Sequence, residues 1–457
     1  MIEEKNFITK TTEGASKVLE MGANEASHLS KIIEKGGTAK KSKKFWNLLG
    51  PGLITGAADD DPSGIATYSQ TGASTGLTFL WLAAFTFPLM AFVQEMCARI
   101  ALVTGKGLAS NIRIHFGKKL LYVCVGLLVV ANTVNIGADL AAMAEAMNLI
   151  APFIPATFFL ILIGFVCILL EVFVSYKKYS SYLKWLTFVL VSYILVALVV
   201  NFRATDLLYS AFVPSFNFDK NSIFLITAIL GTTISPYLFF WQTSQEVEEG
   251  IQNGELTLRS RIKEGPRKIS GMRVDVWIGM FFSNLVMFFI IAVCAETLFK
   301  AGITNIETAG QAAAALRPLA GDGAYLLFAL GIIGTGFLAV PVLAGSSAYA
   351  LSETFGWKEG LYRKLRSARS FYGVIILSIF VGVLLQFVGI PPIKALIYSA
   401  ILNGLIAPIV IILIVLIASN NKIMGTHANA RLSTFVGWFS VALMTIVALA
   451  TIWSLIF

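Results

Sequence analysis

The sequence predicts an all-α integral membrane protein of about eleven transmembrane helices, ten of which form two halves of five. The first reason is composition, because 56% of the 457 residues are hydrophobic and only 13% are charged, whereas soluble domains carry about 25% charged residues. The second is that apolar stretches long enough to cross roughly 30 Å of hydrocarbon recur along the chain. The third is that the first and sixth stretches each contain a proline beside polar residues. These observations exclude a water-soluble enzyme and a disordered or fibrous chain.

Each predicted span is an apolar segment between polar loops. The segments are residues 47–75, 77–101, 119–146, 154–175, 182–202, 222–248, 273–297, 322–351, 370–388, 391–418 and 433–455. Residues 1–45 are lysine-rich and lack the apolar core of a signal peptide, so we expect a cytoplasmic N-terminal tail with a short surface helix at 12–35. The transmembrane domain then covers 46–457, with halves at 46–205 and 220–420, an extra eleventh helix at 433–455, and a short amphipathic surface helix at 306–319.

The loops predict the orientation of the spans. Thirty of the 35 lysines and arginines fall in the tail and in alternate loops, which predicts that those segments face the cytoplasm. We therefore expect a multi-pass protein of the plasma or inner membrane with a cytoplasmic N-terminus and an extracellular C-terminus. The net charge of +9 then reflects topology and contact with the lipid bilayer, so no nucleic-acid partner is expected.

Several classes of chemistry have no signature in this sequence. The four cysteines lie inside apolar runs without metal-ligand or disulfide spacing, and we interpret them as buried packing residues. No phosphate-binding loop, nucleophile motif or zinc motif occurs, so the chain is expected not to be an enzyme and not to need a cofactor. We expect it to act as a monomer.

Two interrupted spans are the strongest functional signal. Pro62 disfavours helix at Asp61, and Pro236 follows Ser235 in the sixth span. Each proline could simply kink a packed helix. However, the two breaks lead two halves of five spans, and because five is odd the second half is inverted. Paired breaks in inverted halves indicate a transport site near the middle of the bilayer.

Three consecutive acids stand at the first break. A charged carboxylate at the centre of a transmembrane helix costs about 2.5–3.5 kcal/mol and marks function by default. We predict that Asp61, beside the break, binds an ion directly. Asp59 and Asp60 are expected to line a hydrated vestibule or to pair with another span, and the cluster would repel an anionic substrate.

The remaining donors at the breaks are oxygens. Unwinding frees the carbonyls of Ala58 and Thr232, and Thr232, Thr233 and Ser235 add hydroxyls. An oxygen-only site suits Mg²⁺, Mn²⁺ or Ca²⁺, which would be the transported substrate. Mg²⁺ is often held by one or two carboxylates while it keeps several waters, and a sparse site around Asp61 fits that habit.

These residues are similar to the NRAMP family of divalent-metal transporters, which has a LeuT-like fold. The family's first-span Asp-Pro-Gly-Asn aligns with residues 61–64, and its sixth-span Met-Pro-His aligns with residues 235–237. Residues 94–106 resemble the end of the family's second span, and Asp139 matches an acid of its third span. The resemblance covers roughly residues 46–420.

The departures from the family pattern point to its magnesium-transporting branch. Gly64 replaces the metal-binding Asn, Ser235 replaces the metal-binding Met, and Tyr237 replaces a His associated with proton movement. Ala142 replaces a Glu of the third span, and Ala400 replaces a Gln of the tenth span, with Asn403 one turn further as a polar substitute. The resemblance therefore implies transport of a largely hydrated Mg²⁺, and of Mn²⁺, by alternating access with weak or absent proton coupling.

Three alternatives remain open from the sequence: a proton-coupled Mn²⁺/Fe²⁺ importer, an amino-acid carrier on the same fold, and a channel. Two ion pairs are also predicted. Glu95 and Arg99 are four residues apart in the second span and are expected to pair with each other. Asp139 is expected to pair with Arg366 or Arg369, as its family counterpart does.

Overall fold

The computed structural model describes residues 50–174, 202–215, 219–254, 265–316 and 321–456, together with isolated positions between 191 and 197. The chain divides into Met1–Gly50 and Pro51–Phe457, and only the second unit is described below. The expected tail helix at 12–35 and most of the expected span at 182–202 lie outside the described residues.

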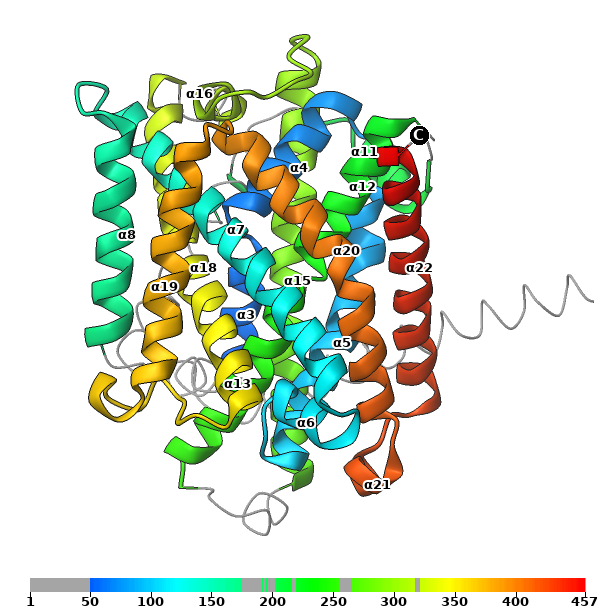
Figure 1. Ribbon diagram of the computed structural model, residues 1–457. Helices are drawn as coiled ribbons and strands as arrows, with labels where there is room; N and C mark the ends of the chain where they lie inside the picture. The colour runs from blue at the N-terminus through cyan, green and yellow to red at the C-terminus, as the bar shows by residue number, and fades with distance from the viewer. Residues whose placement is uncertain are drawn as a thin grey trace, which may run out of the picture. The chain divides into compact units, whose positions relative to one another are not determined.

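The described chain is helical, and both predicted breaks are present (Figure 1). The first span consists of α3 (Pro51–Asp59) and α4 (Pro62–Thr75), and the sixth consists of α12 (Lys220–Thr233) and α13 (Pro236–Gln252). The other long helices are α5 (Trp81–Thr104), α7 (Lys118–Ile150), α8 (Ala156–Phe173), α15 (Gly265–Cys294, continued by a π-helical turn at Ala295–Phe299), α18 (Ala324–Phe355), α19 (Arg369–Leu385), α20 (Pro392–Ala418) and α22 (Arg431–Ile456). Short helices are α6 (Leu108–His115), α11 (Ala204–Phe212), α16 (Ala309–Ala313) and α21 (Asn421–Met424).

The helices have the lengths and composition of membrane spans. Within the described ranges, nine segments are long and apolar enough to cross a bilayer, α12 and α13 being counted together. The interrupted pair α3–α4 is the further span that the sequence predicts. The expected surface helix at 306–319 is shorter than predicted, because α16 covers only Ala309–Ala313 before a 3-10 turn, and a capping box of Thr308 and Gln311 begins it.

The interrupted spans lie at the centre of the bundle. In the α12–α13 segment 83% of the most apolar window is buried, against 33% in α8 and in α19 and 28% in α22. Figure 1 accordingly shows α8, α19 and α22 at the sides of the bundle and α3 behind α7 and α18. The peripheral helices therefore present their apolar side chains to lipid, and the broken helices are enclosed by protein.

Close backbone contacts fix the two half-helices that precede the breaks. A Cβ atom on Gly56 of α3 would lie 2.3 Å from the carbonyl of Gly279 on α15. On α12, a Cβ atom on Gly231 would lie 2.0 Å from the carbonyl oxygen of Ala400 on α20. Small residues at such crossings let two helices in a membrane pack backbone against backbone, so neither half-helix can shift without its neighbour.

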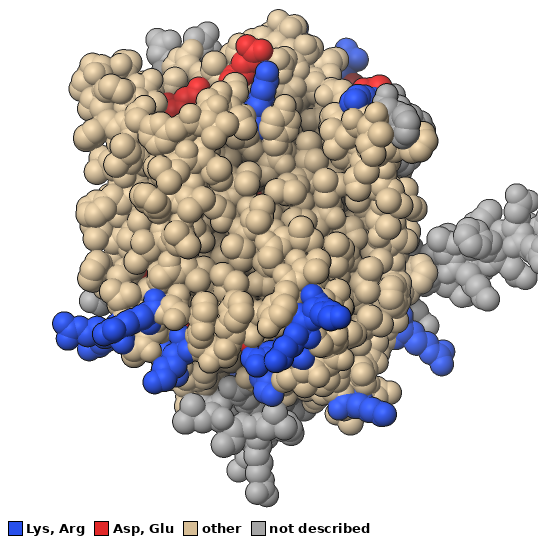
Figure 2. All heavy atoms as spheres, in the orientation of Figure 1, with Lys and Arg blue, Asp and Glu red and all other residues tan. Residues whose placement is uncertain are grey.

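Charge is segregated along the bundle. In Figure 2 most of the visible lysine and arginine gather at one end, which is the end of α6 and α21 in Figure 1. A belt without charged side chains separates them from the other end, where acidic side chains lie beside basic ones. We call the first of these ends the lysine-rich end.

Candidate metal-binding site

The first break is built by a proline and an acid. Helix α3 ends at Asp59, and Asp61 takes an extended conformation (φ −66°, ψ 171°) as the N-cap of α4, with Pro62 in the first turn. Asp61 Oδ1 accepts hydrogen bonds from Ser63 Oγ at 2.6 Å and from the backbone N–H of Gly64 at 2.7 Å. Aspartate is a favoured N-cap and proline a favoured first helical residue, so the local sequence itself restarts the helix here.

Two other helices hold the second oxygen of Asp61 in place. Asn135 of α7 donates from Nδ2 to Asp61 Oδ2 at 2.9 Å, and Ser399 of α20 donates to Asn135 Oδ1 at 2.5 Å. Asp61 is 1% exposed and makes no ion pair in the described part of the chain. An ionised carboxylate offers about four acceptor sites, so the three hydrogen bonds leave it able to bind one further ligand from Oδ2.

Asp59 and Asp60 turn toward α15. Ser283 Oγ lies 2.6 Å from Asp59 Oδ2 and 3.4 Å from Asp60 Oδ1. The other carboxylate oxygens, Asp59 Oδ1 and Asp60 Oδ2, have no hydrogen-bond partner among the described residues, and both side chains are fully buried. These acids therefore contact another span rather than an open, hydrated vestibule.

At the second break, hydroxyl groups of the broken span form hydrogen bonds with backbone carbonyls of the same span. Helix α12 ends at Thr233, and Ser235 precedes Pro236 at the start of α13. Ser235 Oγ lies 2.7 Å from the carbonyl oxygen of Gly231 and 2.6 Å from that of Thr232, and Thr233 Oγ1 donates back to the carbonyl of Ile229. The hydroxyl of Thr232 is buried and has no partner among the described residues.

The two breaks meet at the N-terminus of α4. Tyr237 OH donates to the carbonyl oxygen of Ala58 at 3.0 Å. A Cβ atom on Gly64 would lie 3.2 Å from Thr232 Oγ1 and 3.2 Å from the carbonyl oxygen of Asp59. The end of α3, the start of α4 and both ends of the second break thus surround one small region of oxygen atoms.

Asp139 and Asn403 lie one turn beyond the residues that fix Asp61. Asp139 follows Asn135 on α7, Asn403 follows Ser399 on α20, and the polar side-chain atoms of both are buried without partners among the described residues. The predicted pairing of Asp139 with Arg366 or Arg369 is wrong. Arg366 is exposed in the turn before α19 and Arg369 is exposed at its first residue, whereas Asp139 is fully buried within α7 and neither of its carboxylate oxygens has a partner among the described residues.

The predicted ion pair between Glu95 and Arg99 is also wrong. Glu95 pairs instead with Arg273 at 2.9 Å and accepts from Trp277 Nε1 at 3.2 Å, both on α15. Arg99 donates to the carbonyl of His427 at 3.1 Å and to the side chain of Asn429. Contacts between helices thus replace the local pair that spacing alone suggested.

The sequence does not identify several residues that contact the site. Asn135, Ser283 and Ser399 form the contacts that fix the acids. Asn132, Asn284 and Asn403 lie within four residues of them, so the sequence does not single these three out. Glu171 is the one acid in the segment 154–175, and it is buried in α8 with no partner for either carboxylate oxygen among the described residues. A lone acid in an apolar span is itself a signal, but the sequence does not show which helix it faces.

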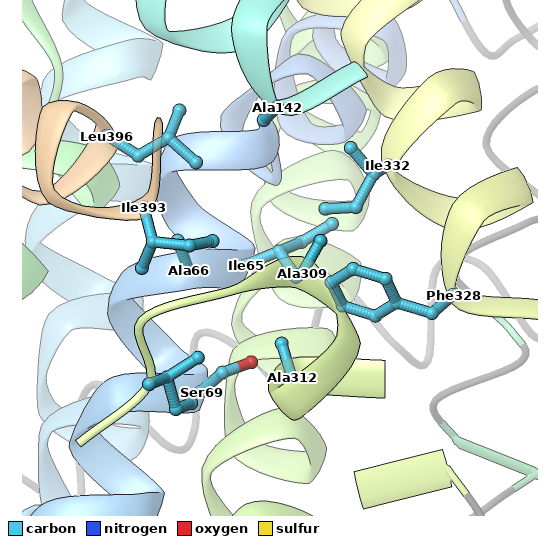
Figure 3. A pocket seen from close by; sticks show the side chains of 11 residues that line it. Ile65, Ala66, Ser69, Ala142, Ala309, Ala312, Phe328, Ile332, Ile393 and Leu396 are labelled. Atoms are coloured by element: carbon cyan, nitrogen blue, oxygen red, sulfur yellow. The ribbon is translucent and has the colours of Figure 1, made fainter. Parts of the chain in front are cut away.

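The region between Asp61 and the end opposite the lysine-rich end is closed. Figure 3 shows a small pocket beside α4, one turn beyond the break, where apolar side chains such as Ile65, Phe328 and Leu396 converge. Gln70 of α4 donates to the carbonyl of Thr304 at 3.0 Å and accepts from the N–H of Ile306 at 2.8 Å. These contacts fasten α4 to the segment before α16, so Asp61 is occluded from that side.

The donor set is sparse. Within the described ranges, no three side chains of His, Cys, Asp or Glu converge as a metal site. A cation bound beside Asp61 would therefore be held by that carboxylate, by backbone carbonyls and hydroxyls, and by water.

Comparison with known proteins gives consistent matches over almost the whole chain. The family described as "Natural resistance-associated macrophage protein-like" (Nramp) matches residues 52–454. The chain is 24% identical over 423 residues to the divalent metal cation transporter MntH of Pectobacterium carotovorum, covering 91% of this chain and 96% of that protein. It is 27% identical over 405 residues to MntH of Caldanaerobacter subterraneus, covering 86% of this chain and 90% of the relative.

Solved structures show the same fold. The Eremococcus coleocola manganese transporter, in complex with an aromatic bis-isothiourea substituted compound, superposes with a TM-score of 0.66 at 17% identity, covering 89% of this chain and 86% of that one. MhsT in complex with L-phenylalanine superposes with a TM-score of 0.56 at 12% identity, covering 88% of this chain and 98% of that one. The predicted LeuT-like fold with broken first and sixth spans is therefore confirmed.

Proposed function

Because this chain belongs to the Nramp family, we propose that it is a secondary transporter of divalent metal cations and not an enzyme. The relatives named MntH are divalent metal cation transporters, and the similar structure from Eremococcus coleocola is a manganese transporter. The proposed substrate of this chain is Mg²⁺, with Mn²⁺ also transported.

The observation that carries this proposal is the chemistry of the atoms around Asp61. Its carboxylate has one free acceptor site, none of its hydrogen-bond partners is sulfur, and the electron-pair donors around it at the two breaks are oxygens. Ser235 stands where the family resemblance places a methionine, and its hydroxyl is hydrogen-bonded. Soft sulfur ligands favour later transition metals, whereas carboxylate and carbonyl oxygens suit Mg²⁺ and Mn²⁺.

The proposed coordination includes water. Asp61 Oδ2 binds the ion. The carbonyl oxygens of Ala58 and Thr232 each accept one hydrogen bond from a hydroxyl group and keep a second lone pair free for the ion. Gly64 carries no side chain, so this position supplies no side-chain ligand, and water completes the proposed shell. Mg²⁺ dehydrates reluctantly, and a site with one carboxylate therefore favours a largely hydrated ion.

The proposed transport cycle uses the breaks as hinges. The ion passes from the region of Asp61 along the partnerless polar groups of Asp139 and Asn403, or toward Asp59 and Asp60 at α15. Thr233 and Tyr237 flank this path at the second break. Opening toward the end that bears α16 requires release of the Gln70 contacts, and alternating access follows if α4 moves relative to α7 and α20.

We propose that the lysine-rich end faces the cytoplasm. Lysine and arginine accumulate on the cytoplasmic side of membrane proteins, and Figure 2 shows this accumulation at one end of the bundle. The C-terminus lies at the opposite end, beside α11 in Figure 1, and would therefore be extracellular.

The proposal is tested by metal competition in proteoliposomes that contain the purified full-length chain. We expect saturable Mg²⁺ uptake that Mn²⁺ inhibits, with little acidification of the lumen. Ser235→Met is expected to shift the competition profile toward Mn²⁺ by about tenfold, since it adds a soft ligand. Thr434→Met, at a hydroxyl of α22 that bonds back to the carbonyl of Ala430 away from the breaks, is the control.

Each alternative gives a different result in the same assay. Strong lumenal acidification with Mn²⁺ or Fe²⁺ uptake would identify a proton-coupled importer. Amino-acid uptake without metal flux would identify an amino-acid carrier. The buried charge of Asp61 argues against this alternative, because it would repel the carboxylate of such a substrate. Flux that does not saturate would identify a channel.

A further inference from the structure

A groove on the lysine-rich end is not used by the proposed transport path. Its walls are the end of α5 with α6, the start of α15, and the segment from α21 to His427. It encloses about 1300 Å³, counting its open mouth. Its apolar lining is Leu102, Val103, Ile114, Ile269, Ile423 and Met424.

The polar lining of the groove is cationic. Lys106, Lys268 and Lys422 line it together with His115 and His427, two of the three histidines in the chain, and none of its described lining residues is acidic. Lys106 and Lys422 are exposed, and their side chains make no ion pair among the described residues. The groove therefore combines a positive rim with an apolar floor.

Hydrogen bonds hold both walls of the groove in place. Asn111 Nδ2 donates to Thr104 Oγ1 at 3.0 Å and to the carbonyls of Lys106 and Gly107 at 3.1 and 2.9 Å, which fixes the turn between α5 and α6. On the other wall, the Arg99 contact with the carbonyl of His427 ties the loop after α21 to α5. A preformed site loses less conformational entropy on binding than a flexible one.

We propose that this groove binds the phosphate-bearing headgroup of an anionic phospholipid from the adjoining leaflet. The phosphate is held by Lys106 and Lys422, and the glycerol and first acyl carbons cover Ile269 and Ile423. Basic pockets between transmembrane helices bind anionic lipid headgroups in this way. A lipid fits better than a small hydrophilic anion because the floor is apolar and lies where the spans leave the bilayer.

The bound lipid would also support the first broken span. The groove includes the start of α15, and six residues further along the same helix Asp275 accepts from the N–H groups of Gly52 at 2.7 Å and of Leu53 at 3.2 Å, at the start of α3. Fixing this end of α15 therefore fixes the helix that anchors α3. We expect phosphatidylglycerol to raise the thermal unfolding midpoint of the protein more than phosphatidylcholine does.

The test is a titration of the purified full-length protein with phosphatidylglycerol, phosphatidylcholine or inorganic phosphate, read by native mass spectrometry and thermal unfolding. The double variant Lys106→Gln/Lys422→Gln is expected to weaken phosphatidylglycerol binding about 30-fold, since each lysine near an anionic surface contributes about 1 kcal/mol. Ile423→Asn, which changes only the apolar floor, is expected to weaken lipid binding without changing the response to phosphate. Lys364→Gln, an exposed lysine outside the groove, is the matched control and is expected to bind as the parent does.

Three outcomes would overturn the proposal. Equal stabilisation by inorganic phosphate would make the ligand a soluble anion. Equal loss of binding in Lys364→Gln would show a general surface potential rather than a groove. Undiminished binding of phosphatidylglycerol by the double variant, shown to be folded by gel filtration, would place the lipid elsewhere.

Discussion

The two broken spans occupy matching positions in the two halves, yet different parts of the molecule hold the polar side chains at each break. At the first break, Asp61 is held by Asn135 of α7, which is held in turn by Ser399 of α20, and its neighbours Asp59 and Asp60 contact Ser283 of α15. At the second break, Ser235 and Thr233 bond back to carbonyls of α12 itself. The acids of the first break are therefore held by three other helices, whereas the hydroxyls of Thr233 and Ser235 at the second break bond to carbonyls of their own span.

This difference assigns different tasks to the two breaks. A buried charge needs partners from its surroundings, so the break that carries the acids is the one tied to the rest of the bundle. The second break needs only to open the helix and present a carbonyl. We infer that affinity for the metal resides at the first break and that the second break completes the shell.

The largest effect is expected at the acid itself. Asp61→Ala removes the carboxylate that we propose binds the ion between the breaks, and Mg²⁺ uptake in proteoliposomes should fall at least about 100-fold, because loss of a buried charge partner costs about 3–5 kcal/mol. Asp206→Ala, at an exposed acid of α11, is the control and should transport normally. Retained uptake by Asp61→Ala would remove the distinction between the two breaks.

A smaller loss is expected at the residue that orients the acid. Asn135→Ala deletes the 2.9 Å hydrogen bond to Asp61 Oδ2, and the apparent affinity for Mg²⁺ should fall about tenfold, since a hydrogen bond to a charged group contributes about 1.5–3 kcal/mol. Asn132→Ala is the matched control on the same helix, because Asn132 donates to Leu343 and Ser347 instead. Equal losses of affinity in both variants would indicate a general defect of α7.

The second break should tolerate substitution better. Ser235→Ala removes a hydroxyl that only caps the end of its own helix, so the apparent affinity for Mg²⁺ should change less than about threefold, with a loss of stability of about 1 kcal/mol. Flux and thermal unfolding of the same preparation measure both quantities. A drop in affinity as large as that of Asn135→Ala would show that Ser235 binds the ion directly.

The smallest effect concerns the far end of the second broken span. Glu248 at the end of α13 accepts from the N–H groups of Leu361 and Tyr362 at 3.0 and 2.6 Å. Glu359 lies in the same loop as Leu361 and Tyr362, between α18 and α19. Burial and the nearby carboxylates of Glu353 and Glu248 raise the pKa of Glu359 from 4.5 to about 9. Between pH 4.5 and about pH 9, Glu359 keeps its proton in the folded protein but has lost it in the unfolded chain. The free energy of unfolding therefore falls as the pH rises through this range.

Glu359→Gln removes this titration. Between pH 6 and pH 9 the thermal unfolding midpoint of the parent should fall by about 2 °C more than that of the variant. Scans of both proteins in the same detergent at several pH values provide the measurement. Parallel curves would show that Glu359 does not affect the anchoring of α13.

The positions of the breaks could be predicted because their causes are local. Pro62 and Pro236 each directly follow a polar residue, whereas Pro88, Pro341 and Pro408 follow apolar residues and lie inside continuous helices. An aspartate before a proline is also an N-cap signal, so the element boundaries at residues 59–62 and 233–236 follow from short stretches of sequence. The three acids stand out because charge is rare in apolar spans.

The partners of the acids could not be predicted, because they depend on packing between distant segments. Ser399 and Asn135 are 264 residues apart in the sequence, and Ser283 is 224 residues from Asp59. The same limitation explains the incorrect pairing of Glu95 with Arg99. Spacing identifies residues that can meet on one helix, but α15 approaches α5 closely enough to offer Glu95 a different cation.

The most direct test of the central claim is a crystal structure of the protein with Mn²⁺ and with the anomalous signal of the ion. The account predicts an anomalous peak beside Asp61 Oδ2, between the carbonyls of Ala58 and Thr232 and with water completing the shell. A peak remote from Asp61, or a continuous helix through residues 59–62, would contradict it.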